Sequence, residues 1–265
     1  LSMKTIKEIN YGLIGHTGFI GSTLKRQYKF NCLYNSSNIK TIHNKDFDFL
    51  ICAGAQAKKW MANKYPKEDR ESIQSLIKSL SKVSCKNFIL ISTVDVFKNP
   101  MEVNELSEIN IDDLHPYGLH RRELEVFVES KFSNSLIVRL PGLVGPGLKK
   151  NIIYDLHNRN NLEEIDSRNI FQFYPVINLW DDIQIAKRLD TKVIHFTSEP
   201  VSVSEISVSA FGKDFNNTLD KIPTSYNFES LFANQMGGEG SYTYNKRESL
   251  QSIRFYAQTE PLSNN

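Results

Sequence analysis

At residues 11–21 the chain reads Tyr11-Gly12-Leu13-Ile14-Gly15-His16-Thr17-Gly18-Phe19-Ile20-Gly21. An apolar strand pattern runs into three glycines spaced three apart, and a helix pattern follows. Glycines in such a turn remove side chains where the backbone must approach a pyrophosphate, which the amides and the positive end of the helix then hold. Tight strand-to-helix turns also select glycine. The position between a strand and a helix nevertheless predicts a dinucleotide site with these contacts: Gly15, Thr17, Gly18, Phe19, Ile20 and Gly21.

Strand and helix patterns alternate over the first two thirds of the chain. Strands are expected at 9–14, 30–34, 47–53, 87–92 and 135–140, and helices at 18–28, 66–83 and 116–131. Alternation with short connections indicates a parallel sheet with helices on both faces. The fold class is therefore α/β, a Rossmann-type doubly wound parallel sheet with a small C-terminal substrate lobe.

After Pro141 the pattern changes to a loop that is rich in glycine and proline. A helix at 151–158, an aromatic run at 170–177, a helix at 179–189 and a strand at 192–197 follow, and the remainder reads as polar and broken. We expect a dinucleotide-binding domain over 1–140 plus about 176–200. The small lobe would then comprise about 141–175 and 201–265.

The composition excludes several classes of protein. Of the 265 residues 40% are hydrophobic and 23% charged, and the net charge of +2 is too small to argue for nucleic acid or a membrane surface. No apolar run reaches the roughly 18 residues of a membrane span. The three cysteines are few, odd in number and widely spaced, which predicts free thiols in a reducing cytoplasm and no metal site.

Polar residues follow two of the expected strands. Asn35-Ser36 comes after the second strand, where an acid would hold a ribose diol and an arginine a 2′-phosphate, and neither is present. A small polar ribose pocket and a plain turn are equally good interpretations, and the cofactor would be NAD or NADP. Ser92-Thr93 ends a buried strand, so its hydroxyls either face the ligand crevice or cap the strand.

Tyr117 and Arg121 are four residues apart on one expected helix and therefore share a face. A cation beside a phenol favours the phenolate form, which makes tyrosine usable as an acid or base. The alternative is a surface helix on which Arg121 pairs with Glu125.

In combination these motifs resemble the extended short-chain dehydrogenase/reductases, in particular the branch of NAD-dependent epimerases and dehydratases that modify nucleotide-linked sugars. The resemblance covers residues 9 to about 200. The elements that carry it are the glycine turn at 15–21, Cys52-Ala53-Gly54-Ala55, Ser92-Thr93, Tyr117-Gly118 with Arg121-Arg122-Glu123-Leu124-Glu125, Val138-Arg139-Leu140-Pro141, and Gly145-Pro146-Gly147.

The resemblance implies a nicotinamide cofactor, with Thr93 as a hydrogen-bonding hydroxyl and Tyr117 as the acid/base. Further cofactor contacts would come from Asn35, Ser36, Cys52, Ala53, Gly54, Tyr117, Arg121, Leu140 and Pro141. Substrate contacts would come from Asp95, Lys149, Asn151, Gln172 and Tyr174. The plainer interpretation is a solvated lysine pair at 149–150 and a half-buried strand at 171–174.

Three positions depart from the family pattern. Arg121 stands where the family has the lysine that binds the nicotinamide ribose and lowers the tyrosine pKa. Val94 replaces the first of two acids that the dehydratases have, which argues against 4,6-dehydration, and Phe97 replaces a usual tyrosine. The expected function is 4-epimerisation or 4-keto reduction of a nucleotide-linked sugar, with Thr93, Tyr117 and Arg121 as catalytic residues. A cofactor-binding sensor or assembly protein that no longer turns over is the competing hypothesis, and the short lobe allows a homodimer to complete the pocket.

Overall fold

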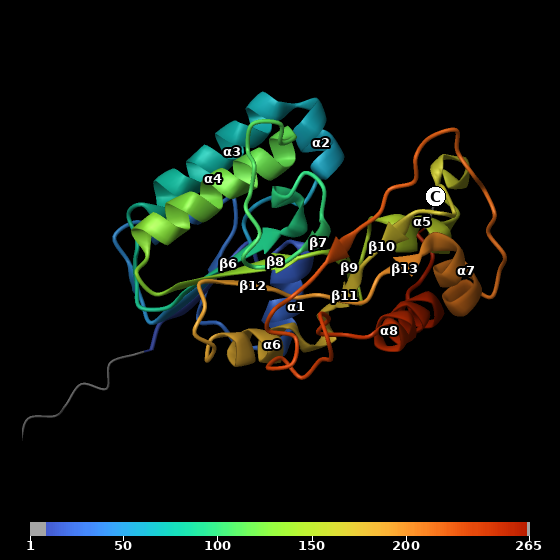
Figure 1. Cartoon of the computed structure of the whole chain (residues 1–265). Coiled ribbons are helices and arrows are strands. Elements are labelled where there is room, and N and C mark those ends of the chain that lie inside the picture. Colours follow the sequence, from blue (N-terminus) through green and yellow to red (C-terminus); the bar gives the residue numbers. More distant parts are fainter. Residues whose placement is uncertain (1–8, 264–265) are drawn as a thin grey trace, which may run out of the picture. The chain divides into compact units, whose positions relative to one another are not determined.

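The computed structural model describes residues 9–263, which divide into two compact units (Figure 1). Within that range the first unit consists of the residues up to Ser92 together with His115–Ile137. The second consists of Thr93–Leu114 together with the residues from Val138 onward. The predicted α/β class is confirmed by a six-stranded sheet with the order β12 (Val193–His195), β8 (Ser135–Leu140), β6 (Phe88–Thr93), β4 (Phe49–Cys52), β1 (Tyr11–Ile14) and β2 (Cys32–Tyr34).

The strands of the first unit are in parallel register. β1 lies between β2 and β4, and Ile14 is level with Tyr34 on one side and Cys52 on the other. β4 pairs in parallel with β6. Since parallel strands end at a common edge, the turns that follow β1, β2 and β4 meet there. β4 is buried along its whole length, and β1 is buried from Gly12 to Ile14, as their apolar sequences predict.

Helices cover both faces of this part of the sheet. α3 (Pro66–Leu80) and α4 (Pro116–Lys131) lie side by side on one face, with α2 (Lys59–Lys64) beside them, and α1 (Phe19–Gln27) lies on the other (Figure 1). α3 begins at Pro66 with two acids in its first turn, as the sequence indicates. His115 caps α4 by accepting a hydrogen bond from the Gly118 amide at 3.1 Å. Shorter elements are η1 (Ile39–Ile42), β3 (Asp46–Phe47) and β5 (Ser84–Cys85).

The second unit is built from short strands and several helices. β9 (Gly142–Val144) pairs in parallel with β11 (Phe173–Pro175), β10 (Ile170–Phe171) pairs antiparallel with β13 (Val201–Ser202), and β7 (Met101–Val103) pairs with β14 (Asn227–Phe228). Its other elements are η2 (Val94–Val96), α5 (Ile152–Asn158), η3 (Leu162–Glu164), η4 (Val176–Asn178), α6 (Leu179–Ala186), α7 (Val203–Phe211) and α8 (Lys246–Thr259).

Helices α7 and α8 correct the prediction that the last part of the chain is polar and broken. Each begins with a capping box, formed by Ser202 with Glu205 and by Asn245 with Glu248. In both boxes the cap side chain accepts from a backbone amide three residues on, and the glutamate accepts from the cap amide. The two helices pack against each other. Across residues 9–263 no helix is both long and apolar enough to cross a membrane.

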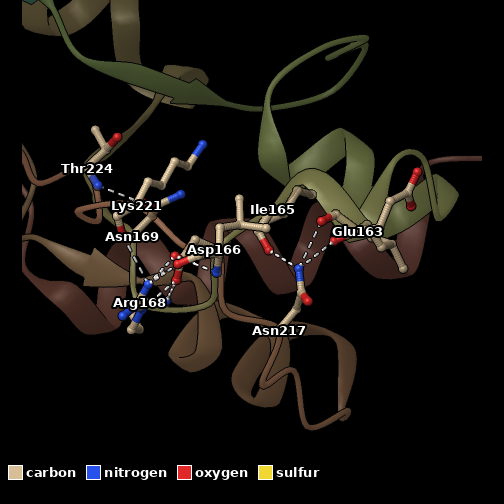
Figure 2. A network of polar contacts seen from close by, with 10 residues as sticks. Glu163, Ile165, Asp166, Arg168, Asn169, Asn217, Lys221 and Thr224 are labelled. Carbon is tan, nitrogen blue, oxygen red and sulfur yellow. Dashed lines mark hydrogen bonds and ion pairs between the residues drawn. The ribbon is translucent and has the colours of Figure 1, made fainter.

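A network of hydrogen bonds and an ion pair holds the irregular segment 213–226 to the turn around Asp166 (Figure 2). The buried Asp166 carboxylate accepts from the Arg168 side chain at 2.7 and 2.9 Å and from the Leu219 amide at 3.1 Å. Asn217 donates to the carbonyls of Ile165 and Glu163. These contacts supply partners for backbone that has no regular secondary structure.

Replacing Asp166 with asparagine is expected to lower the melting temperature by a few degrees at pH 7. The hydrogen bonds from Arg168 hold the pKa of Asp166 well below its ordinary value, although burial opposes them. A lowered carboxyl pKa stabilises the fold above the unfolded-state value of about 3.9, and this stabilisation is lost as the pH falls through the folded-state pKa.

The measurement is thermal unfolding of the wild type, Asp166→Asn and a control, Glu164→Gln, in which an exposed acid of the same turn is changed. The deficit of Asp166→Asn should shrink between pH 5 and pH 2, and the control should match the wild type. A deficit that stays constant with pH would show that the charge of the carboxylate is not what stabilises the network.

Candidate active site

The turn between β1 and α1 requires glycine at two of its three positions for internal packing. Gly15 has φ +85°, and a Cβ there would lie 2.2 Å from the Ala53 carbonyl oxygen. A Cβ on Gly21 would lie 2.0 Å from the Gly15 oxygen. At Gly18 a Cβ would meet that oxygen at 3.5 Å, an ordinary contact, and the residue is exposed. Only at Gly18 does the fold itself leave room for a side chain.

The amino end of α1 is arranged as an anion site requires. Its N-cap residue is Gly18, no side chain caps it, and its first turn contains no acid. The amides at a helix start carry partial positive charge. Thr17 is exposed beside them, whereas Phe19 and Ile20 are half-buried.

The residues after β2 and β4 lie at the same sheet edge as the glycine turn. Asn35 uses its side-chain oxygen within its own turn, where it accepts from the Ser37 amide at 2.9 Å and the Ser37 hydroxyl at 2.6 Å. This favours the plain-turn interpretation for Asn35, while Ser36 is exposed. Cys52 is fully buried, and burial raises the pKa of its thiol to about 11. Ala53 and Gly54 are half-buried, and their predicted cofactor contacts stay predictions.

Tyr117 and Arg121 lie together, as their spacing in α4 predicts. The carbon at the centre of the Arg121 guanidinium is 4.0 Å from the centroid of the Tyr117 ring. Both side chains are buried, with Arg121 only 3% exposed. The Tyr117 amide donates to the Asn63 side chain of α2 at 3.0 Å. The two predicted catalytic groups of this unit are therefore held against each other.

The ion partner of Arg121 is Asp69, on α3. Nη1 of Arg121 donates to Oδ2 of Asp69, and Nη2 donates to the Gln56 carbonyl at 2.5 Å. His120 Nδ1 lies 2.6 Å from the same Asp69 oxygen. Burial raises the pKa of Asp69, but the hydrogen bonds from Arg121 and His120 outweigh it and leave that pKa lowered. Arg121 Nε is buried and has no hydrogen-bond partner among the described residues.

Glu125, the alternative partner of Arg121, is used elsewhere. Its fully buried carboxylate accepts from the Ser92 hydroxyl at 2.6 Å and from Arg122 at 2.8 Å. Ser92, near the end of β6, therefore holds α4 through Glu125. The sequence alone left open whether its hydroxyl faces the ligand crevice or caps the strand. The pairing of Asp69 with Arg121 has no signal in sequence spacing, because the residues are 52 positions apart.

A pocket of about 390 Å³ lies beside this cluster in the first unit. Asp69 and Gln56 both line it, so the anchors of Arg121 also reach its wall. Its other lining residues are Lys58, Met61, Ala62, Tyr65, Glu68 and Ser72. Within residues 9–263 no cluster of three or more His, Cys, Asp or Glu side chains has the arrangement of a metal site.

In the second unit Thr93 and Asp95 form a small polar group. The Thr93 hydroxyl oxygen accepts from the Asp95 amide at 3.1 Å and caps η2. Tyr226 donates from its hydroxyl to Asp95 at 3.2 Å. The capping interpretation of Thr93 therefore applies, and both side chains remain partly exposed. Their predicted roles toward substrate stay predictions.

The remaining predicted positions differ in how accessible they are. Leu140 and Pro141 are buried, and Lys149 is exposed. Asn151 caps α5, accepting from the Ile153 amide at 2.9 Å, in a backbone conformation (φ 80°, ψ 174°) that glycine ordinarily occupies. Strain of this kind clusters at ligand sites.

Gln172 and Tyr174 are enclosed in the second unit. Gln172 is 1% exposed and donates to the carbonyls of Ser198 and Phe228, while its oxygen accepts from the Phe228 amide. Tyr174 is fully buried and donates to Asp182. Both side chains are satisfied internally, which favours packing over the predicted substrate contact.

The sheet order and the glycine turn between β1 and α1 define a Rossmann-type α/β fold. No model of a known protein family matches the chain, and no curated protein matches its sequence. Solved structures share its fold. One is the UDP-glucose 4-epimerase of Thermotoga maritima with UDP-glucose, 16% identical over 95% of this chain and 99% of that one, with a TM-score of 0.70.

Two further solved structures agree over similar lengths. A dTDP-4-dehydrorhamnose reductase of Clostridium acetobutylicum is 17% identical over 94% of this chain and 99% of its own, with a TM-score of 0.71. An NAD-dependent NDP-hexosamine 5,6-dehydratase of tunicamycin biosynthesis is 15% identical over 97% and 100%, with a TM-score of 0.73. At these identities the likeness establishes the fold, and the fold is the one that the sequence predicts.

Proposed function

We propose that the chain binds NAD or NADP and interconverts a hydroxyl and a ketone on a nucleotide-linked sugar. In this scheme Tyr117 takes or gives the proton of the sugar oxygen, and Arg121 holds the ribose of the cofactor. The bound nicotinamide would supply or accept the hydride. Structures of the same fold include a UDP-glucose-bound epimerase, a reductase and an NAD-dependent dehydratase, which supports this class of reaction.

The observation that carries the proposal is the amino end of α1. It has no side-chain cap and no acid, and it follows a turn in which Gly15 and Gly21 are fixed by packing while Gly18 stays open. A pyrophosphate would fit against those amides because nothing in the turn occupies the approach. Nε of Arg121 gives a second reason, because it has no hydrogen-bond acceptor among the described residues and a ribose hydroxyl would supply one.

The contacts between Arg121 and Asp69 support a second candidate, a protein that binds the cofactor and catalyses no reaction. The Arg121 charge is offset by Asp69, and Nη1 and Nη2 donate to protein acceptors. An arginine whose charge is paired with a carboxylate stabilises a phenolate less than a lysine without such a partner does. A sensor or assembly role would need only the dinucleotide site.

Tyr117→Phe separates the two candidates. The purified chain is incubated with reduced cofactor and a panel of nucleotide-linked ketosugars, and cofactor absorbance is followed. If Tyr117 is the acid/base, Tyr117→Phe should lose about 10²–10⁴-fold in rate and keep its cofactor affinity in calorimetry. Cofactor binding without turnover in the wild type would support the binding protein, and absence of cofactor binding would contradict both.

A further inference from the structure

The side chains of Asp69, His120 and Arg121 form a buried cluster in the first unit. The side chains are 9%, 4% and 3% exposed respectively. They join α3 to α4, and the Tyr117 ring lies against the guanidinium. Burying a cation at this depth requires a partner of opposite charge, and Asp69 is that partner.

The hydrogen bonds of Arg121 fix the plane of its guanidinium. Nη1 donates to Asp69 and, at 3.4 Å, to the Tyr117 carbonyl, while Nη2 donates to the Gln56 carbonyl. Acceptors from three segments hold the flat group over the Tyr117 ring. A lysine has one nitrogen and no plane, so it cannot make this arrangement.

The cation over the Tyr117 ring belongs to an ion pair. The Arg121 guanidinium lies over the ring, and the His115 ring centroid is 6.4 Å from that of Tyr117. Asp69 contacts Arg121, and His120 contacts Asp69. Asp69 offsets the cation that would otherwise favour the phenolate. Tyr117 therefore faces a nearly neutral ion pair.

We propose that Asp69 is a positioning residue that holds Arg121 over Tyr117 and offsets its charge, which favours the phenol form of Tyr117 that donates a proton in ketone reduction. This rests on the proposed function of Tyr117. In the step, the carbonyl carbon gains a hydride from the reduced nicotinamide dinucleotide, and the carbonyl oxygen gains the phenol proton. The ketone becomes a secondary alcohol, the dinucleotide is left oxidised, and the phenolate regains a proton from water.

The test is the ionisation of Tyr117, which needs neither cofactor nor substrate. Because the chain has 11 tyrosines, the phenolate absorbance of each protein is compared with that of the same protein carrying Tyr117→Phe. Asp69→Asn keeps the size of the side chain and removes its charge, so the midpoint of Tyr117 should move down by about one pH unit or more. Glu123→Gln is the control, because it breaks the exposed Arg70–Glu123 pair between the same two helices and should leave the midpoint unchanged.

If Asp69→Asn does not fold, a double variant tests whether Asp69 offsets the charge of Arg121. Asp69→Asn with Arg121→Gln removes both charges together, and its Tyr117 midpoint should match that of the wild type if the pair is neutral toward the phenol. A rise of about one pH unit or more in this double variant would show that Asp69 does not offset Arg121. Equal midpoints in Asp69→Asn and the wild type would overturn the proposal as well.

Turnover provides the functional readout. At saturating substrates and pH 7, the wild type should have a larger kcat for reduction of a ketosugar by reduced cofactor than for oxidation of the matching alcohol, and Asp69→Asn should narrow that difference in kcat. Failure of the proposed function would appear as no turnover in either direction with the titration results intact. An unchanged ratio of the two directions in a folded Asp69→Asn protein would contradict the positioning role.

Discussion

Replacing Arg121 with alanine is expected to lower the free energy of unfolding by about 3–5 kcal/mol. The Asp69 side chain is only 9% exposed in the wild type, and the substitution removes its arginine partner while His120 remains beside it. A buried charge that loses its partner retains the full cost of its desolvation. The change also removes the group that packs on the Tyr117 ring and the donor to the Gln56 carbonyl.

Urea unfolding followed by circular dichroism measures this effect, and Arg70→Ala is the matched control. Arg70 also pairs with an acid across α3 and α4, but its side chain is 46% exposed, and such pairs contribute about 0–1 kcal/mol. Adding Asp69→Leu to Arg121→Ala removes the buried carboxylate and should recover part of the loss. If Arg121→Ala and Arg70→Ala lower the free energy of unfolding by the same amount, the Asp69–Arg121 pair contributes no more to stability than a surface pair does.

This expectation changes how activity data on Arg121 must be interpreted. The sequence alone predicts that Arg121→Lys retains or improves turnover, because lysine is the residue at this position in the family that the sequence resembles. The structure shows acceptors from three segments around the guanidinium, and a lysine would leave some of them unsatisfied. Loss of activity in Arg121→Lys would therefore reflect the geometry set by Asp69 as well as the identity of residue 121.

Much of the first unit could be predicted because its signals are local. Apolar runs such as Phe49–Cys52 lie where the strands are, and Pro66 with its acids begins α3 where expected. Helices α7 and α8 were missed although both capping boxes are visible as Ser202-x-x-Glu205 and Asn245-x-x-Glu248. The region from 201 onward is polar over much of its length, and this obscured a local signal that was present.

The candidate site was predictable only in part, because its decisive contacts join distant positions. The spacing of Tyr117 and Arg121 predicts their contact, and the structure has it. Spacing also offers Glu125 as an ion partner, whereas the true partner, Asp69, comes from another helix. The packing of α3 on α4 brings Asp69 next to Arg121, and no pattern within either helix predicts that contact.

Replacing Gly18 with valine is expected to weaken NAD(P) binding by at least about 100-fold, or about 2.7 kcal/mol, and to change the free energy of unfolding by no more than about 1 kcal/mol. Gly18 has φ −77° and ψ 172°, a backbone conformation open to any residue, and its Cβ would make only an ordinary contact. The added side chain would instead stand at the amino end of α1, where the pyrophosphate must approach. Calorimetric titration with both cofactors measures the binding.

Gly15→Ala is the comparison that separates ligand access from folding. Its positive φ and the 2.2 Å approach to the Ala53 oxygen predict a loss of about 2–6 kcal/mol in stability from backbone strain and overpacking together. Loss of binding in a Gly15 variant would therefore say little about the ligand, whereas Gly18→Val tests it in an intact fold. Undiminished affinity in folded Gly18→Val would show that the turn serves only to pack α1 on the sheet, and the proposed dinucleotide site would then be wrong.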